Sequence, residues 1–267
     1  MTDQTESYSA AAEVAAFRSR RTRRERAWIE LKKAPPTAIF GLIVIIFYIV
    51  VALFAPLLAP YGEAEALGQS YEPWSGEHPL GTDQIGRDIL TRLIYGARNT
   101  IGIAFVTTLL AFLIGGSLGL IAAINRGWLD QIISRGVDVL MAIPSLIFAL
   151  MLLSIFGSSA LSLILIIAVL DSTRVFRLTR SVAVGVAVMD YVEAAQLRGE
   201  RLGWVMRREI LPNIMPPLVA EFGLRFCFVF LTIAALSFLG VGIQPPTADW
   251  GTMVRETANL IQFASFD

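Results

Sequence analysis

Three kinds of functional residue are nearly missing from this 267-residue sequence. Its two lysines, Lys32 and Lys33, are neighbours. The chain therefore has neither the Gly-Lys-Ser/Thr triplet of a P-loop nor a lysine inside an apolar segment that could carry a Schiff base. The single histidine, His78, excludes a multi-histidine metal site, and Cys227 lacks a partner for an intrachain disulfide. We expect no catalytic, metal or cofactor site, and ATP, if it drives this protein, binds to another chain.

Charge is also scarce, at 16% of residues, whereas a soluble domain carries about a quarter. Apolar residues make up 55% of the chain and gather into blocks long enough to cross a membrane. Positive and negative charges balance, so no overall field attracts nucleic acid. These features predict an all-α, polytopic membrane protein in contact with lipid.

The N-terminal part divides into a polar tail and a basic segment. Residues 1–17 are predicted to be disordered. A dense basic run follows and directly precedes the first apolar block, which favours a cytoplasmic anchor over a nucleic-acid-binding arm. We therefore expect a cytoplasmic N-terminus; the run consists of Arg18, Arg20, Arg21, Arg23, Arg24, Arg26, Lys32 and Lys33.

Five membrane spans are predicted. Spans one, two and five cover residues 37–59, 101–124 and 215–242. The uncharged run 139–170 would be about 48 Å long as one helix, against about 30 Å of hydrocarbon. We expect it to break at Gly157-Ser158-Ser159 into spans three and four, with a kink at Pro144 and, before it, a short inside turn that holds Arg126, Trp128 and Arg135. A sixth span would begin where the chain stops, which suggests a truncated sequence.

The loop between spans one and two, residues 61–99, has the acidic excess that an outside loop tolerates. Apolar residues recur at helical spacing between Ile85 and Ile94, and Thr82 or Asp83 could cap a helix there. Acidic residues also precede basic ones by four positions, the favourable order on a helix, in the pairs Asp83–Arg87 and Asp88–Arg92. We expect an amphipathic helix at the outer membrane interface. Residues 18–99 would form one region and residues 100–267 the membrane-spanning core.

A polar, arginine-rich stretch, residues 190–212, lies between spans four and five, and span parity places it inside. Glu193-Ala194-Ala195, Gly199 and Leu211-Pro212 in this stretch resemble the EAA loop of ABC-importer permeases. Two other passages are similar to the C-type permease subunits of dipeptide/oligopeptide (or nickel) ABC importers. They are His78-Pro79-Leu80-Gly81-Thr82-Asp83 with Gly86-Arg87-Asp88, and Leu236-Ser237-Phe238-Leu239-Gly240 with Gln244-Pro245-Pro246 and Trp250-Gly251.

The resemblance implies a type I ABC-importer transmembrane domain in the bacterial inner membrane. Its partners would be a second permease subunit in a heterodimer, two ABC ATPases that bind the ATP, and an extracytoplasmic substrate-binding protein. The cargo would be di- or oligopeptides, with nickel or another small solute as the alternative. The loop would dock on an ATPase through Glu193, Ala194, Ala195, Gly199, Leu211 and Pro212.

Charges inside the spans are the remaining candidates. Glu221 and Arg225 lie four apart in span five, where the family is usually apolar, and either pair with each other or line the substrate path. Asp171 with Arg174 is similar but lies nearer the inner surface, which favours snorkelling and local pairing over a place on the path. In the outer loop, Gly81, Asp83, Arg87 and Asp88 are expected to fix the interfacial helix, or to contact the binding protein.

Two other functions would require features of their own in the sequence. A stand-alone secondary transporter should show an internal repeat with broken helices at matching positions, and neither is clear in the sequence. An intramembrane enzyme needs a nucleophile–base pair or a metal cluster within its spans, and no histidine or lysine is there.

Overall fold

The computed structural model describes residues 34–125 and 127–263, with side chains up to residue 258. The predicted tail and basic run lie outside the described residues. Within them the chain is helical, without strands, as the sequence predicts. The helices are α3 (Pro36–Leu58), α4 (Ile89–Ile124), α5 (Trp128–Met141), α6 (Ser145–Phe156), α7 (Ala160–Ala187), α8 (Asp190–Leu197), α9 (Leu202–Val205), the π-helix η1 (Met206–Ile210), α10 (Leu211–Phe238) and α11 (Trp250–Phe263).

The chain divides into two units, with the boundary between Val50 and Val51. α3, which crosses the boundary between them, has 23 residues and no charge. At 1.5 Å per residue it is about 34 Å long, enough to cross a hydrocarbon core of about 30 Å.

Three parts of the described chain are long and apolar enough to span a membrane: α3, α4 and the continuous helical segment Leu202–Phe238. The bent pair α5 and α6 can supply a fourth span. α7 has the length of a span but carries four charged residues between its middle and its end, Asp171, Arg174, Arg177 and Arg180. The five-span count therefore stays a prediction.

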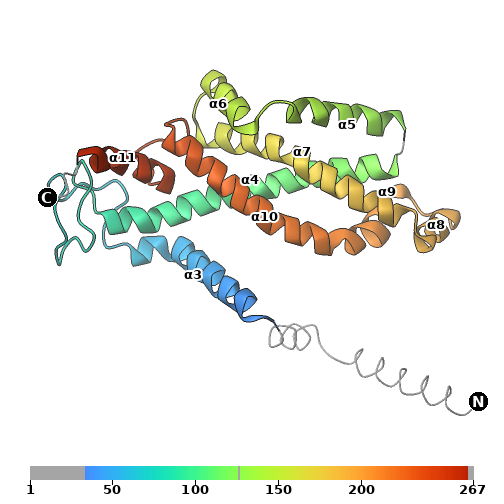
Figure 1. Ribbon diagram of the computed structural model, residues 1–267. Helices are drawn as coiled ribbons and strands as arrows, with labels where there is room; N and C mark the ends of the chain where they lie inside the picture. The colour runs from blue at the N-terminus through green and yellow to red at the C-terminus, as the bar shows by residue number, and fades with distance from the viewer. Residues whose placement is uncertain (1–33, 126, 264–267) are drawn as a thin grey trace, which may run out of the picture. The chain divides into compact units, whose positions relative to one another are not determined.

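In the unit 51–267, α4, α7 and α10 lie side by side (Figure 1), and α4 packs most extensively against α7. Two glycines on α4 allow this contact. A Cβ on Gly115 would collide with the carbonyl oxygen of Ser172, and one on Gly119 would come within 2.9 Å of the carbonyl oxygen of Phe176. The backbones of α4 and α7 therefore meet directly, as small residues allow in a membrane.

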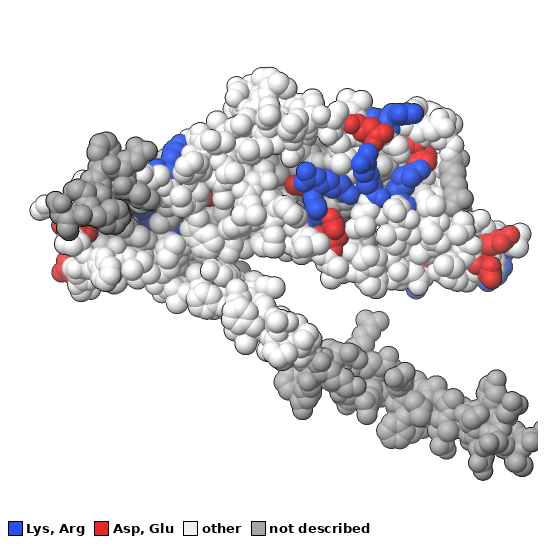
Figure 2. Space-filling model, in the orientation of Figure 1, with Lys and Arg blue, Asp and Glu red and all other residues white. Residues whose placement is uncertain are grey.

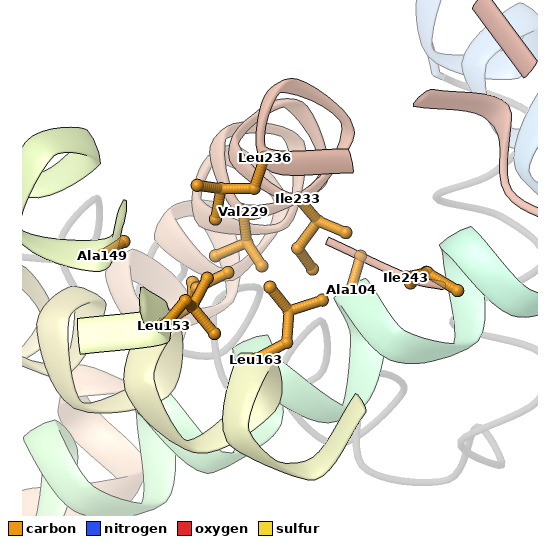
Figure 3. Packing of buried hydrophobic residues seen from close by; sticks show 9 residues of the cluster. Ala104, Ala149, Leu153, Leu163, Val229, Ile233, Leu236 and Ile243 are labelled. Atoms are coloured by element: carbon orange, nitrogen blue, oxygen red, sulfur yellow. The ribbon is translucent and has the colours of Figure 1, made fainter. Parts of the chain in front are cut away.

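An apolar cluster joins four helices of this unit (Figure 3). Val229, Ile233 and Leu236 project from α10 toward Leu163 on α7 and Leu153 on α6. All five side chains are almost fully buried. α6 is thereby fixed against α7 and α10, and Ala104 brings α4 into the same cluster.

The polar stretch 190–210 and the loop that follows α3 lie at opposite ends of this unit. Figure 1 shows α8 and α9 at one end, and α11 with the loop of residues 59–88 at the other. The sequence predicts the same separation, with the stretch 190–212 inside and the loop 61–99 outside. Below, we call residues 190–210 the elbow and residues 59–100 with 243–258 the outer platform.

The predicted interfacial helix over residues 85–94 is not seen as a separate element. α4 begins after Asp88 and continues without a break to Ile124, so that it includes the predicted span two. Asp88, rather than Thr82 or Asp83, caps the helix by accepting from the N–H of Thr91 at 2.7 Å. The preceding residues form turns, because Gly86 has a φ of +82° that does not continue a helix.

The uncharged run breaks at residues 157–159, as predicted, with Gly157 at a φ of +85° and Ser159 capping α7. A second break, at Pro144, is larger than the kink that the sequence predicts. α5 ends at Met141 and α6 begins at Ser145, and their axes differ by 87°. Pro144 therefore ends one helix and starts another instead of kinking a single one. The predicted short turn before this run is also mostly helix, since α5 begins at Trp128.

Candidate functional site

The elbow is a helix–turn–helix. α8 ends at Leu197, and the chain turns through Gly199, whose φ of +81° favours glycine, before α9 begins at Leu202. The N–H of Gly199 donates to the carbonyl of Gln196 at 2.9 Å. A Cβ on Gly199 would meet nothing within 4 Å, so this glycine is required by the backbone conformation and not by lack of space.

The underside of the elbow is apolar and fully buried. Val192 and Ala195 from α8, Val205 from α9 and Ile210 from η1 have no exposed surface. They form one cluster with the ends of the three central helices, through Leu120 and Ala123 of α4, Ala183 of α7, and Ile214 and Leu218 of α10. A displacement of the elbow must therefore move these helix ends, because close-packed side chains transmit strain.

The upper face of the elbow differs from the sequence prediction at one residue. Glu193 and Ala194 are exposed, but Ala195 belongs to the buried underside and is not available to a partner. Leu197, one helical turn beyond Glu193, is 82% exposed and was missed by the sequence analysis. The spacing of Val192 and Ala195 could have revealed which face of α8 remains outside.

The sequence suggests that Leu211 and Pro212 end the stretch 190–212. In the structure they do not end it. The helix continues through them into α10, by way of the π-turn η1. The N–H of Leu211 donates to the carbonyl of Met206, five residues back. Proline has no N–H and its ring crowds the carbonyl four residues earlier, so a widened turn lets the helix pass Pro212. The second part of the elbow, from Leu202, is thus the beginning of one helical segment that ends at Phe238.

A charge cluster lies between α7 and α10, formed by Asp171, Arg174, Glu221 and Arg225. The guanidinium Nε of Arg225 lies 2.6 Å from Glu221 Oε1, and its Nη1 lies 3.7 Å from Asp171 Oδ1. Arg174 Nη1 is 3.5 Å from the same Asp171 oxygen. The spacing of Glu221 and Arg225 correctly predicted their contact, but the link from α10 to α7 required the fold.

Two further ion pairs join α5 to α7. Arg180 forms a bidentate pair with Asp130, with both distances 2.5 Å, and Arg177 Nη2 lies 2.6 Å from Asp138 Oδ1. Figure 2 shows acidic and basic side chains gathered over these helices, on a face that is otherwise mostly uncharged. The sequence analysis missed these pairs because it placed no helix over residues 128–138.

The outer platform contains a buried ionic cluster that joins α4 to α11. Asp83 Oδ2 accepts from Arg87 Nε and from Arg92 Nη1, both at 2.7 Å. Arg92 Nη1 also lies 2.6 Å from Glu256 Oε2, and Arg87 Nη2 is 3.6 Å from it. The predicted contact of Asp83 with Arg87 is present, although in a turn, whereas Arg92 pairs with Asp83 and Glu256 in place of Asp88.

The pKa of the Asp83 carboxyl is lowered by its surroundings. Burial alone would raise the pKa of Asp83, but hydrogen bonds from the backbone N–H groups of Arg87 and Ile85, together with the Arg87 guanidinium, hold it below 3.8, its ordinary value. The carboxylate therefore stays charged throughout the neutral range. Neighbouring Gly81 has a φ of +77° and no room for a Cβ beside the carbonyl oxygen of Glu72.

All four outer-loop residues singled out from the sequence are buried. Gly81, Asp83, Arg87 and Asp88 thus build the platform, and their side chains have little surface to offer a partner. Asp88 Oδ1 also lies 3.1 Å from His78 Nδ1, which makes this histidine a neighbour of the α4 cap.

The motif after span five completes the platform. Asp249 Oδ1 accepts from the hydroxyl of Thr100 at 2.9 Å, and Asp249 Oδ2 caps the start of α11 at the N–H of Thr252. Trp250 Nε1 donates to the carbonyl of Leu93 at 3.0 Å. Glu63 Oε1 accepts from the N–H of Ala248 at 2.6 Å. Two motifs that lie far apart in the sequence are therefore parts of one structure.

Comparison with known proteins agrees with this arrangement. Residues 115–266, more than half of the chain, match the family described as the binding-protein-dependent transport system inner membrane component. The chain belongs to this family. Residues 22–73 match the N-terminal TM domain of oligopeptide transport permease C.

Several curated relatives of this permease are peptide-transport proteins. It is 38% identical to the dipeptide transport system permease protein DppC of Alkalihalophilus pseudofirmus, over 89% of this chain and 78% of the relative. It is also 38% identical to the Escherichia coli protein of the same name, over 85% and 78%. Identity to the di/tripeptide transport system permease protein DppC of Pseudomonas aeruginosa is 35%, over 85% and 77%.

A solved structure supports the fold. The permease resembles a chain of the MetNI methionine ABC transporter in an inward-facing conformation, with a TM-score of 0.55 and 18% identity, over 65% of this chain and 83% of that one. The sequence-based prediction of an ABC-importer transmembrane domain is thereby confirmed. The protein is a multi-pass transmembrane permease subunit of an ABC transporter, and this replaces the alternative of a stand-alone secondary transporter.

Proposed function

We propose that this permease subunit imports di- or oligopeptides, and that it draws the energy from ATPase subunits that dock on the elbow. The observation that carries the proposal is the two-sided construction of the elbow: its underside is buried against α4, α7 and α10, whereas Glu193, Ala194 and Leu197 remain exposed. Such an element can receive a partner's movement and pass it to the bundle. No metal, catalytic group or bound cofactor is assigned to this chain in the proposal.

The elbow connects to the charge cluster through one helical segment, Leu202–Phe238. Val205 at its start and Arg225 in the cluster are 20 positions apart, or about 30 Å along a helix. Movement of the elbow would therefore shift Glu221 and Arg225 relative to Asp171 on α7. This geometry supports a place for Glu221, Arg225 and Asp171 on the substrate path. Movement driven by ATP would break and re-form the ion pairs between them.

The remaining assembly follows from the same orientation. With the elbow on the cytoplasmic side, the outer platform faces the opposite side, where an extracytoplasmic binding protein would deliver the cargo. The N-terminus would be cytoplasmic, and the membrane would be the bacterial inner membrane. A second permease subunit would complete the path, and two ATPases would bind, one to each permease. The names of the relatives motivate the peptide cargo.

The docking role is tested by Gly199→Asp and Glu193→Lys. Both variants should insert normally and yet uncouple ATP hydrolysis from uptake, with uptake of a labelled dipeptide reduced at least about tenfold. An aspartate at φ +81° strains the turn, and a lysine reverses the charge that faces the partner. The assay is uptake into proteoliposomes that contain both permeases, both ATPases and the binding protein, with ATP hydrolysis measured in parallel.

Gly127→Asp is the matched control, because Gly127 is also an exposed turn glycine with positive φ and open space around it, but lies outside the elbow. It should leave uptake close to that of the unmodified protein. Normal coupled uptake by both elbow variants would overturn the docking role. ATP-dependent uptake of nickel without any uptake of peptide would overturn the proposal that the cargo is a peptide.

A further inference from the structure

The bend between α5 and α6 is an unusual feature for a membrane protein. Seven consecutive residues, 141–147, are exposed, and the backbone between Met141 and Ser145 is not helical. Such backbone is tolerated at membrane depth only where it is covered by protein or lines a water-filled cavity, because lipid cannot satisfy its polar groups. Broken helices of this kind commonly form substrate sites in transporters.

Arg174 is the least compensated of the arginines on α7. Its closest carboxylate oxygen lies 3.5 Å away and belongs to Asp171, which Arg225 also contacts. The guanidinium groups of Arg177, Arg180 and Arg225, in contrast, each have a carboxylate oxygen within 2.6 Å. The side chain of Arg174 is nevertheless 43% exposed. A charge in this position cannot face lipid cheaply, so it faces water, cargo or a partner.

Arg174 and the bend line the same cavity. Its volume is about 120 Å³, and Arg174 supplies its charge. The rest of the lining is mainly apolar, with Leu140, Met141, Ile143, Pro144 and Leu170 beside Ser145 and Thr173. At about 30 Å³ for each water molecule, the cavity could hold about four waters, or a carboxylate with a small side chain.

We propose that Arg174 binds the C-terminal carboxylate of the transported peptide, while the apolar lining of this cavity receives the side chain of the last residue. The proposal rests on the proposed peptide cargo. A guanidinium can hold a carboxylate through two parallel hydrogen bonds, which is a stronger contact than the present 3.5 Å approach to Asp171. Asp171 would then be left to Arg225, and cargo binding would be linked to α10.

The test uses nanodiscs that contain the complete importer without its binding protein, so that binding to the permease is measured alone. The probe is labelled Ala-Ala, with its C-terminal amide as competitor. Arg174→Gln should weaken Ala-Ala binding at least about tenfold, and Arg174→Lys should weaken it less because it keeps the charge. In the unmodified importer the amide should compete at least about tenfold more weakly than unlabelled Ala-Ala, and in Arg174→Gln the two should compete alike.

Arg177→Gln is the control, since Arg177 is one turn further along α7, is similarly exposed, and pairs fully with Asp138 away from the cavity. It should bind Ala-Ala like the unmodified importer. Unchanged binding by Arg174→Gln, equal weakening by Arg177→Gln, or no binding to the unmodified importer at millimolar Ala-Ala would each overturn the inference.

A parallel uptake assay with the binding protein present separates this inference from the proposed function. If the unmodified importer shows no ATP-dependent uptake of Ala-Ala, the proposed function fails. If uptake occurs but Arg174→Gln leaves both binding and uptake unchanged, only the carboxylate site fails. Basal ATP hydrolysis by the Arg174 variants shows that they have assembled.

Discussion

Replacing Gly115 by alanine tests the direct backbone contact between α4 and α7. The added Cβ would collide with the carbonyl oxygen of Ser172 and come within 2.9 Å of both Phe176 N and Val175 Cβ. Two of these atoms belong to backbone and cannot rotate away, so the two helices must separate. Overpacking of this kind costs about 1 to 3 kcal/mol, and separation would also weaken the contact at Gly119 one turn later.

Gly116→Ala provides the matched control for this prediction. It adds the same methyl group at the next residue of the same helix, where nothing lies within 4 Å. Alanine is a better helix former than glycine by about 1 kcal/mol, so this variant should be neutral or slightly stabilised. Gly115→Ala gains the same helix propensity, so the two variants should differ by the overpacking cost alone, about 1 to 3 kcal/mol.

The measurement is thermal unfolding of the purified permease in detergent, followed as loss of monodisperse protein. For chains of 150 to 250 residues, 1 kcal/mol corresponds to about 2 to 4 °C, so Gly115→Ala should unfold about 2 to 12 °C below Gly116→Ala. Equal midpoints for the two variants would refute the close contact of α4 with α7.

Two further predictions concern the outer platform. Glu256→Gln should destabilise the permease by about 3 to 5 kcal/mol in the same assay, because it leaves the buried Arg87 and Arg92 with Asp83 alone, whereas Thr257→Val on the exposed side of α11 should change little. The pKa of Asp83 is lowered by folding, so its stabilisation is complete above its ordinary pKa of 3.8 and is lost as the pH falls through the lower folded value. The stability difference between the unmodified permease and Asp83→Asn should therefore shrink as the pH drops below about 4, and a difference independent of pH from 3 to 7 would contradict this.

The sequence predicted the helical character well, because hydrophobicity over about 20 residues is a local property. It also predicted the break at Gly157, where glycine and two serines interrupt an apolar run. It underestimated the bend at Pro144, since the cost of bending a helix by 87° depends on which neighbours cover the exposed backbone. The start of α4 was missed because Asp83, a good cap by type, binds the turn instead, and Asp88 caps the helix.

The candidate sites show the same division between local and distant information. The contact of Glu221 with Arg225 follows from helical spacing alone. Their connection to Asp171 and the contact of Arg92 with Glu256 join residues on different helices, which no local pattern reveals. The buried position of Ala195 likewise follows from the packing of the elbow on the central helices.

The outer platform has a consequence for how the chain is made. Its bonds join residues far apart in the sequence, with 185 positions between Glu63 and Ala248 and 164 between Arg92 and Glu256. Until α11 is synthesised, Asp83 alone must balance Arg87 and Arg92, which leaves one excess positive charge within this buried cluster. We expect the platform to close only after α11 has been inserted, long after the loop that α11 joins has been made.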